Sequence, residues 1–398
     1  MKCLELKKDF YYVGVIDHNL KVFDVAVKTE YGSSYNSYLL KTKEGNIVFE
    51  GNKELFENEY LGNLSSFGKL EEISYLFVTH TEPDHSGAIS TLLEKNPNIT
   101  IVASYGALTN LEKIIRRPFK KIVAKDGETL TIGDYHFRFI SGIFLHWPDV
   151  MFTYIEELDA LVCCDAFGAH YAEDDVLLSK NKDKEGYEKA FDYYFEKIMG
   201  PFPSFVKIAA KKVLALNPSL ICTGHGPVID CNQKERVERY ITLADTLFPE
   251  PKADSVCIVL CSAYGYTRKM GEAIKETMLK AGKTVTFYEI DALNYGELKD
   301  RIVHSMYESQ LLLLGSPTVA GDAVCLFYDL LAAVPSTIGK GRSASCFGDY
   351  GWSGEAVGNL SARLLQLHYA LIPGFKANFK MDEALKNGFV DYIETLLK

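Results

Sequence analysis

The sequence predicts an α/β protein built from two domains, each with its own hydrophobic core. The chain has 398 residues, more than a single core usually serves. In its second half, apolar segments alternate with helical patterns in the regular order of a doubly wound parallel sheet. In its first half, histidines and carboxylates follow apolar segments, as expected for side chains gathered at one edge of a sheet.

A proline-containing segment separates the two predicted domains. Phe248-Pro249-Glu250-Pro251 follows a helical pattern that includes residues 238–246, and a new apolar strand starts at Val256. Proline ends a helix because it lacks an N–H group and restricts the residue before it. We therefore place the first domain at residues 1–249 and the second at residues 250–398.

Composition and charge narrow the class of protein. The net charge of −10 argues against nucleic acid as the main partner. No apolar run approaches membrane-spanning length, and the start Met1-Lys2-Cys3-Leu4 shows no signal-peptide pattern. The nine cysteines form no C-x-x-C pair, and several lie inside apolar strands, as buried thiols do in a reducing compartment. We expect a soluble cytoplasmic protein.

The segment His80-Thr81-Glu82-Pro83-Asp84-His85 carries the strongest chemical signal. It follows the apolar residues 75–78, so a strand end and a tight loop would bring its imidazoles and carboxylates together, with Ser86-Gly87 opening the next helix. Side chains crowded in this way repel each other and lose solvation unless they share a cation. The segment therefore predicts one wall of a two-metal site.

Three further metal-type residues follow apolar segments that we interpret as strands: His146 after residues 141–145, Asp165 after 160–164 and His225 after 220–222. Each alone is ordinary, because an aspartate after a strand is usually a helix cap and a lone histidine is usually structural. Together they predict a centre of four histidines and three carboxylates. Two divalent ions, three carboxylates and one bridging hydroxide sum to zero charge, and this hard set suits iron, which can change oxidation state, better than zinc.

Three loops in the second half predict a nucleotide site. Residues 262–267 follow the first strand and precede a helix, where hydroxyl and backbone N–H groups can bind phosphate. Residues 315–318 follow the third strand, and residues 348–354, with Tyr350 and Trp352, follow the fourth. In a sheet of order 2-1-3-4-5 these loops meet at the topological switch point, where aromatic rings can contact a flat ligand.

The order of motifs in the first half resembles the metallo-β-lactamase fold, an αββα sandwich, and the whole chain resembles the flavodiiron proteins, which join that domain to a flavodoxin-like one. The resemblance is carried by H-x-E-x-D-H, by T-G-H-G-P around His225, and by F-G-x-Y-G-W-S-G-E-A at residues 347–356. It implies one iron on His80, Glu82 and His146. It implies a second iron on Asp84, His85 and His225, with Asp165 bridging the two.

The resemblance also implies bound FMN. Its phosphate would contact Ser262, Gly265, Tyr266 and Thr267. Its ring would lie near Pro317, Thr318, Tyr350, Gly351, Trp352 and Ser353. The chain departs from the family pattern in the phosphate loop, which reads Tyr-Gly-Tyr-Thr where Gly-Asn-Thr is common, and at Glu50, where an aspartate is typical. We expect one amide contact to phosphate to be lost and Glu50 to have a structural effect.

The implied activity is that of an oxidoreductase that reduces O2 to water at an iron pair fed by FMN, with reduction of NO to N2O as a secondary reaction. Primary NO reduction is the alternative. The resemblance implies a head-to-tail homodimer or a dimer of dimers, and a donor such as rubredoxin or a reduced deazaflavin. His18, Tyr193 and Tyr194 resemble groups that donate hydrogen bonds near the substrate pocket, and which tyrosine faces the metals stays open.

Two other classes of protein compete with this interpretation. A dinuclear zinc hydrolase with a flavodoxin docking module is favoured by the lactamase-like fold and disfavoured by Glu82, which stands where such hydrolases carry a histidine. A non-enzymatic electron carrier with a degenerate first domain is disfavoured by the intact ligand positions. His170 follows Asp165 closely, so it is placed either to approach the metals or to form a loop hydrogen bond, and we expect the hydrogen bond. We assign no role to His136, His304 and His368.

Overall fold

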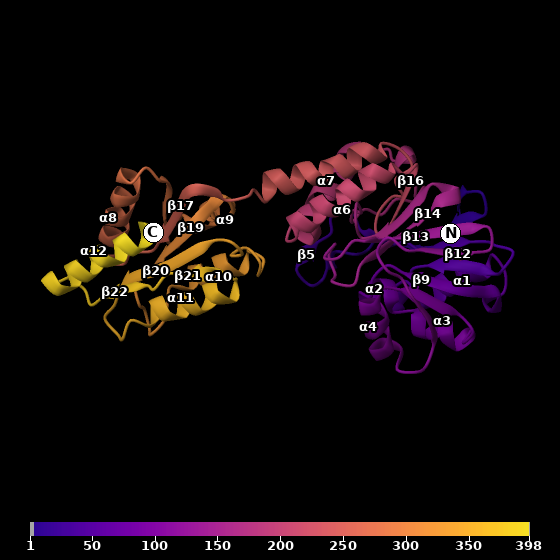
Figure 1. Ribbon diagram of the computed structural model, residues 1–398, viewed down its shortest axis with the longest axis horizontal. Helices are drawn as coiled ribbons and strands as arrows, with labels where there is room; N and C mark the ends of the chain where they lie inside the picture. The colour runs from indigo at the N-terminus through magenta and orange to yellow at the C-terminus, as the bar shows by residue number, and fades with distance from the viewer. Residues whose placement is uncertain (1–3, 398) are drawn as a thin grey trace. The chain divides into compact units, whose positions relative to one another are not determined.

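The structure is a computed structural model that describes residues 4–397. The chain forms two compact units that divide between Thr246 and Leu247 (Figure 1). The expected domain boundary after Pro249 stays a prediction. The first three residues, on which the expectation of no signal peptide rests, lie outside the described part. Within residues 4–397, no helix combines the length and the apolar character needed to cross a membrane.

The first unit is built around two β-sheets. One sheet has seven strands in the order β1-β2-β7-β8-β9-β10-β11, and the other has five in the order β12-β13-β14-β15-β16. Two short ribbons, β3 with β6 and β4 with β5, complete the unit. The strands are β1 (Leu4–Lys7), β2 (Phe10–Tyr12), β3 (Val15–Asp17), β4 (Val22–Phe23), β5 (Val27–Lys28), β6 (Ser33–Tyr35), β7 (Tyr38–Leu40), β8 (Asn46–Phe49), β9 (Ile73–Val78), β10 (Thr100–Ala103), β11 (Lys120–Val123), β12 (Thr129–Ile132), β13 (Tyr135–Ser141), β14 (Met151–Ile155), β15 (Ala160–Cys164) and β16 (Leu220–Thr223).

Helices cover both outer faces of this sandwich. They are α1 (Glu57–Ser65), α2 (Pro83–Ser86), α3 (Ile89–Lys95), α4 (Tyr105–Ile115), α5 (Lys184–Tyr194), α6 (Pro203–Leu216) and α7 (Gln233–Leu247). Leu64 of α1, Leu92 of α3 and Leu108 of α4 share a core with the outer face of the seven-stranded sheet. Figure 1 shows α6 and α7 on the side of the five-stranded sheet. The layers are therefore α, β, β and α, which confirms the predicted architecture.

Aromatic rings fill the space between the two sheets. Phe137 of β13 has its ring centroid 4.9 Å from that of Phe77 of β9 and 6.2 Å from that of Phe49 of β8. All three side chains are buried. Period-two alternation places every second residue of these strands in this inner core. The strand ends carry their polar residues beyond it.

Two local expectations in the first unit are wrong. Residues 141–145 do not form a strand, because β13 ends at Ser141 and the chain turns at Phe144, which has a φ of +63° and donates its N–H to the carbonyl oxygen of Trp147 at 2.8 Å. Ser86 and Gly87 do not open a helix: Ser86 is the last residue of α2, which starts at Pro83, and the next helix, α3, begins at Ile89. Proline suits the first turn of α2 because its missing N–H is not needed there.

The second unit is a doubly wound parallel sheet. Its strands are β17 (Lys252–Leu260), β18 (Thr284–Glu289), β19 (Ser309–Gly315), β20 (Ser343–Asp349), β21 (Ala370–Leu371) and β22 (Phe375–Ala377), and its helices are α8 (Tyr266–Lys280), α9 (Tyr295–Glu308), α10 (Cys325–Ala332), α11 (Glu355–Gln366) and α12 (Glu383–Leu397). The order is β18-β17-β19-β20-β21, with β22 also paired to β20. Counted within the unit, this is the predicted order 2-1-3-4-5.

Each face of this second sheet has its own core. Val259 of β17 faces the core formed with α9, α10 and α11, whereas its neighbour Ile258 faces the core formed with α8 and α12. The alternation leaves both faces apolar, as a sheet covered on both sides requires. The loops after β17, β19 and β20 are therefore held at one edge of a rigid sheet.

We expect the change Phe137→Ala to destabilise the first unit by about 3–5 kcal/mol, because it leaves a cavity between the two sheets. The control is Arg138→Ala on the same strand, whose exposed side chain should change stability by less than about 0.5 kcal/mol. Urea unfolding followed by tryptophan fluorescence and circular dichroism measures both. Equal midpoints for the two variants would contradict this packing.

Candidate metal centre and flavin site

Seven buried donor side chains come together at the strand ends of the first unit. The backbone brings them from four places: the end of β9 with α2, the loop between β13 and β14, the end of β15 and the end of β16. They are His80, Glu82, Asp84, His85, His146, Asp165 and His225. Their exposed fractions are 6% or less, apart from the side chain of His146 at 14%. All seven are metal ligands predicted from the sequence.

One half of the cluster surrounds a single oxygen of Asp165. Its Oδ2 atom lies 3.4 Å from His80 Nε2 and 3.2 Å from His146 Nε2. The outer carboxylate of this half is Glu82, whose Oε2 lies 2.8 Å from His146 Nε2 and 3.5 Å from His80 Nε2. Two imidazoles and two carboxylates thus surround a common point.

The other half surrounds the second oxygen of Asp165. Its Oδ1 atom lies 2.9 Å from His85 Nε2 and 3.5 Å from His225 Nε2. Here the outer carboxylate is Asp84, whose Oδ2 lies 3.4 Å from His85 Nε2 and 3.2 Å from His225 Nε2. The two halves have the same composition and share only Asp165, which is the geometry of two adjacent cation sites with one bridging carboxylate.

Several atoms of the cluster are buried without a hydrogen bond in the described residues. They include both ring nitrogens of His80, both carboxylate oxygens of Asp84 and Oδ2 of Asp165. Buried polar atoms nearly always have a partner, because an unpaired one costs the free energy of its lost solvation. The free donor atoms and the hard character of the ligand set fit a pair of bound iron ions.

Electrostatics in the metal-free cluster favour protons where the cations would be. Burial opposes a charge on the ring of His85, but the carboxylates of Asp84 and Asp165 outweigh it and raise its pKa to about 9. The pKa of His146 is likewise raised to about 9 against burial, by the nearby carboxylates of Asp165 and Glu82. Burial also works against a charge on Glu82, but the nearby rings of His146 and His80 hold its pKa at about 2.

Backbone contacts orient the ligands from behind. His225 Nδ1 lies 2.6 Å from the carbonyl oxygen of Ser34, which can only accept, so the ring carries its proton there and turns the lone pair of Nε2 to the cluster. The carbonyl oxygen of His85 accepts the N–H of Gly51 at 2.7 Å. The carboxylate of Glu50 accepts the N–H of Thr79 at 3.1 Å, directly before His80.

Two further residues contact this centre: His170, which was expected to form only a loop hydrogen bond, and Asp24, which was not expected. His170 is buried, its Nδ1 lies 3.0 Å from Ser33 Oγ, and its ring centroid is 5.0 Å from that of His225. Its position five residues after Asp165 was the available signal. Asp24, in the turn between β4 and β5, has a pKa raised to about 6 by burial and by the neighbouring Glu82, and no pattern in the sequence marks it.

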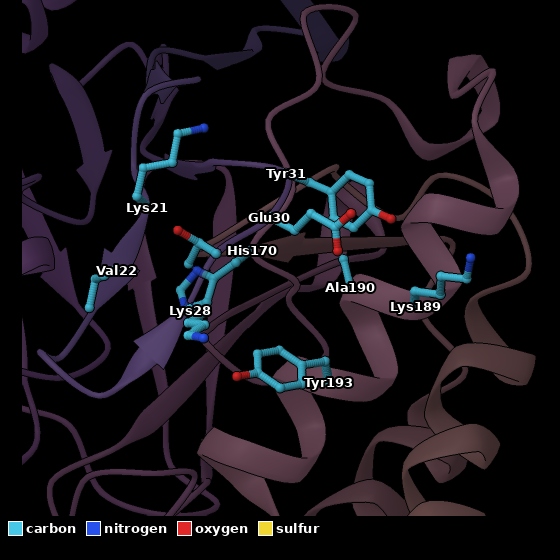
Figure 2. Close-up of a pocket in the computed structure, with 10 residues that line it drawn as sticks. Lys21, Val22, Lys28, Glu30, Tyr31, His170, Lys189, Ala190 and Tyr193 are labelled. Carbon is cyan, nitrogen blue, oxygen red and sulfur yellow. The ribbon is translucent and has the colours of Figure 1, made fainter.

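A cavity of about 750 Å³ opens beside His170 (Figure 2). Its lining includes Lys21, Lys28 and Tyr193. Tyr194 instead is 1% exposed, and its ring centroid lies 4.8 Å from that of His170. Of the two adjacent tyrosines, Tyr194 therefore faces the histidines and Tyr193 faces the cavity.

The side chain of His18, expected near the substrate pocket, has a partner at the protein surface. It is 55% exposed and its Nε2 lies 2.8 Å from Asp174 Oδ1, a surface carboxylate. This contact directs the ring to solvent, so a role as a hydrogen-bond donor at the metals is not supported by the geometry.

The loops expected to bind FMN lie together at the strand ends of the second unit. Ser262 Oγ accepts the N–H groups of Gly265 at 3.1 Å and Arg268 at 3.2 Å, which closes the phosphate loop on itself. Gly265 has a φ of +83°, a conformation that favours glycine. The side chain of Thr267 is fully buried and its hydroxyl donates to Asp349, so it braces two loops instead of facing the open edge.

Aromatic side chains line the open edge of this unit. Trp352 is 59% exposed and Tyr264 is 84% exposed. Tyr350 lies under the ammonium group of Lys376, 5.5 Å from its ring centroid. The N–H of Thr318 donates to the carbonyl oxygen of Asp349 at 2.9 Å and joins the loops after β19 and β20. Exposed flat rings above a fixed loop are suited to a planar ligand.

Comparison with known proteins relates this chain to one family. Residues 34–226 match the family described as ODP family beta lactamase. The chain is 33% identical over 373 residues to the flavo-diiron protein FprA2 of Clostridium acetobutylicum, and the match covers 92% of each chain. It is 30% identical over 371 residues to a type A flavoprotein of Rhodobacter capsulatus, covering 91% of this chain and 83% of the relative.

Solved structures share the fold over the whole chain. Rubredoxin oxygen:oxidoreductase from Desulfovibrio gigas has a TM-score of 0.67 at 24% identity and covers 100% of this chain and 98% of its own. The flavodiiron protein of Giardia intestinalis has a TM-score of 0.65 at 25% identity, covering 99% and 96%. The chain therefore belongs to the flavodiiron proteins, oxidoreductases that carry FMN and a non-haem diiron site.

Proposed function

We propose that this protein reduces O2 to water, and that it reduces NO to N2O as a secondary activity. The observation that carries the proposal is the division of the donor cluster into two equal halves around the two oxygens of Asp165. One iron would be held by His80, Glu82 and His146, and the other by Asp84, His85 and His225, with Asp165 bridging them. When bound, the iron pair supplies Lewis acidity and two electrons, and FMN supplies two more.

The flavin would bind at the edge of the second unit. Its phosphate would lie against the backbone at Gly265 and Tyr266, at the start of α8. Its ring would contact Trp352 and the loop containing Pro317. The structure leaves the hydroxyl groups of Ser262 and Thr267 engaged with the protein, so we assign these two residues a supporting role.

Residues around the cavity would donate hydrogen bonds to the small substrate and supply its protons. Burial and the nearby His225 lower the pKa of His170, so its ring is neutral, and Nε2 has no hydrogen bond in the described residues. The hydroxyl group of Tyr194 is buried and has no hydrogen-bond partner among the described residues. We propose that these two groups, together with Tyr193 at the cavity, provide hydrogen bonds beside the metals, in place of His18.

The proposed assembly is a head-to-tail homodimer or a dimer of dimers, fed by a carrier such as rubredoxin or a reduced deazaflavin. The name of the Desulfovibrio gigas relative pairs rubredoxin with oxygen. Sedimentation of the flavin-loaded protein measures its oligomeric state. A monomer that still turns over would contradict the proposed assembly.

Anaerobic amperometry of the iron-loaded protein tests the activity directly. We expect faster consumption of O2 than of NO, and a reversed order would make the protein primarily an NO reductase. Reduction of O2 to water takes four electrons and four protons, so donor consumed per O2 distinguishes it from partial reduction. Two zinc ions per chain with hydrolytic turnover would support the rival class, a zinc hydrolase.

The change Asp165→Asn should remove the shared ligand. We expect the bound iron to fall below two per chain and turnover to fall by more than about 100-fold, beyond the 10–100-fold effect typical of residues behind a ligand. The control Asp174→Asn removes an exposed carboxylate, 82% exposed, that pairs with His18 and should leave both quantities unchanged. Iron quantitation and amperometry on the same samples measure the two effects.

The metal-free protein should lose stability as the pH rises from about 6.5 to about 9. The pKa of His85 and that of His146 rise from 6.5 to about 9 on folding, so the folded chain binds more protons than the unfolded one in this window. Their stabilisation is complete below pH 6.5 and is lost as the pH passes 9. Urea midpoints at pH 6 and pH 9.5 test this, and the iron-loaded protein should change less because cations replace these protons.

The change Trp352→Ala should weaken FMN binding. Loss of one ring contact is worth about 0.5–1.5 kcal/mol, which is roughly two- to tenfold in Kd. Fluorescence titration of the flavin-free protein with FMN measures this constant. Leu365→Ala removes a side chain of similar exposure, 62%, on α11 and should leave the Kd unchanged. Equal Kd values for the two variants would remove Trp352 from the flavin site.

A further inference from the structure

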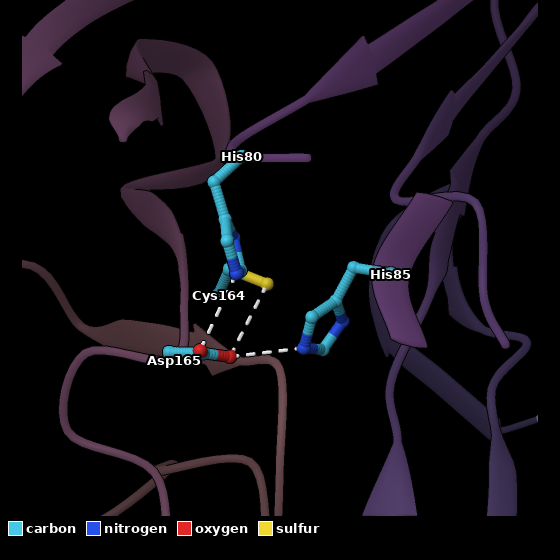
Figure 3. A group of neighbouring side chains, drawn as sticks. All are labelled: His80, His85, Cys164 and Asp165. Carbon is cyan, nitrogen blue, oxygen red and sulfur yellow. Dashed lines mark hydrogen bonds and ion pairs between the residues drawn. The ribbon is translucent and has the colours of Figure 1, made fainter. Parts of the chain in front are cut away.

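Cys164 adds a thiol to the metal centre that the proposed iron ligands do not include. Its sulfur, one nitrogen each of His80 and His85, and one oxygen of Asp165 all lie within 4.8 Å of one another (Figure 3). The sulfur is 3.7 Å from Asp165 Oδ1. All four side chains are 1% exposed or less, so the group is enclosed by protein.

The backbone turns this sulfur to the centre and the sulfur of the preceding residue away from it. The pairing of β15 with β16 shifts register between Val162 and Cys164, and Cys164 has a φ of +49°. Cys163 Sγ instead lies 3.1 Å from the carbonyl oxygen of Ala166 and 3.7 Å from that of Cys222. Of these two consecutive buried cysteines, Cys164 therefore reaches the donor cluster and Cys163 does not.

Gly224 leaves the space that the sulfur occupies. A Cβ atom at this position would lie 2.7 Å from Cys164 Sγ and 2.9 Å from His85 Cε1, closer than such atoms can approach. The same group contains buried polar atoms without hydrogen bonds among the described residues, namely both ring nitrogens of His80 and Oδ2 of Asp165. These atoms are free to bind a cation, which is an observation independent of the cysteine.

We propose that a single thiophilic divalent cation, such as Zn²⁺, binds this centre through His80, His85, Cys164 and Asp165. Two imidazoles, one thiolate and one carboxylate make a four-ligand set that suits tetrahedral zinc, and the soft sulfur distinguishes it from the all-nitrogen-and-oxygen iron set. As the metal bonds form, the thiol releases its proton to solvent, and so do His80 and His85 wherever their ligating nitrogens carry one. The thiolate, the carboxylate and the dication then sum to zero charge.

Binding in this mode excludes the iron pair. His80 belongs to one half of the proposed iron site and His85 to the other, so one ion held by both takes a ligand from each half. The same ion also uses Asp165, the carboxylate that would bridge the irons. This exclusion rests on the proposed function, whereas binding of zinc through sulfur does not.

X-ray absorption at the zinc edge tests the proposal on the full-length metal-free chain loaded with one Zn²⁺ per chain. We expect one sulfur at about 2.3 Å together with nitrogen and oxygen at about 2.0–2.2 Å. The matched control Cys163→Ser should keep the sulfur, and Cys164→Ser should lose it and bind zinc at least about tenfold more weakly in competition with a chelator.

A wild-type spectrum with nitrogen and oxygen alone overturns the proposal without any variant, as does a sulfur shell that persists in Cys164→Ser. Should Cys164→Ser fail to fold, Cys164→Ala replaces it. Iron loading gives a second readout: one zinc per chain should prevent uptake of two irons. If zinc binds through sulfur but the zinc-free chain never takes up two irons, the proposed function is wrong and this inference stands. If the chain takes up two irons but its zinc has no sulfur ligand, this inference is wrong and the proposed function stands.

Discussion

The arrangement of the first unit depends on one buried carboxylate, that of Asp165. The charges on His80 and His85 hold its pKa well below the usual range although burial acts in the opposite direction. Together with Asp84, it supplies the negative charge shared by the ring nitrogens of His85 and His225, which lie only 3.1 Å apart. Asp165 directly follows β15. The position of the end of β15 relative to the ends of β9 and β16 therefore determines how far Asp165 lies from the ligands of each half of the centre.

Around this carboxylate, the strand ends are held together mainly by hydrogen bonds to backbone atoms. The side-chain amide of Asn36 donates to the carbonyl oxygens of Thr223 and Gly226, at 2.9 and 2.8 Å, and so clamps both sides of His225. The phenol of Tyr38 donates to the same Thr223 carbonyl at 2.6 Å. Such contacts fix ligand positions before any cation arrives, so less reorganisation accompanies metal binding.

The sequence predicts those parts of the molecule that short-range patterns determine. The metal ligands from His80 to His85 lie within six residues, and the 2-1-3-4-5 sheet follows from regular alternation of strands and helices. Contacts between distant segments carry no such signal: Ser33 and His170 are 137 positions apart, and Asp24 meets Glu82 from a turn. Tyr193 and Tyr194 are neighbours on a helix, so only the packing of that helix shows which one lies inside.

The cavity beside His170 is lined by lysines, although the protein as a whole has a net charge of −10. Its lining holds the lysines Lys21, Lys28 and Lys189 against the one carboxylate of Glu30, so positive charge is in excess there. An uncharged diatomic gas experiences no net electrostatic attraction to such a region. An anionic solute is attracted over roughly 10 Å at 0.1 M salt. Raising the ionic strength would therefore lower the local concentration of anions at the cavity mouth. It would leave the diffusion of uncharged gases unaltered.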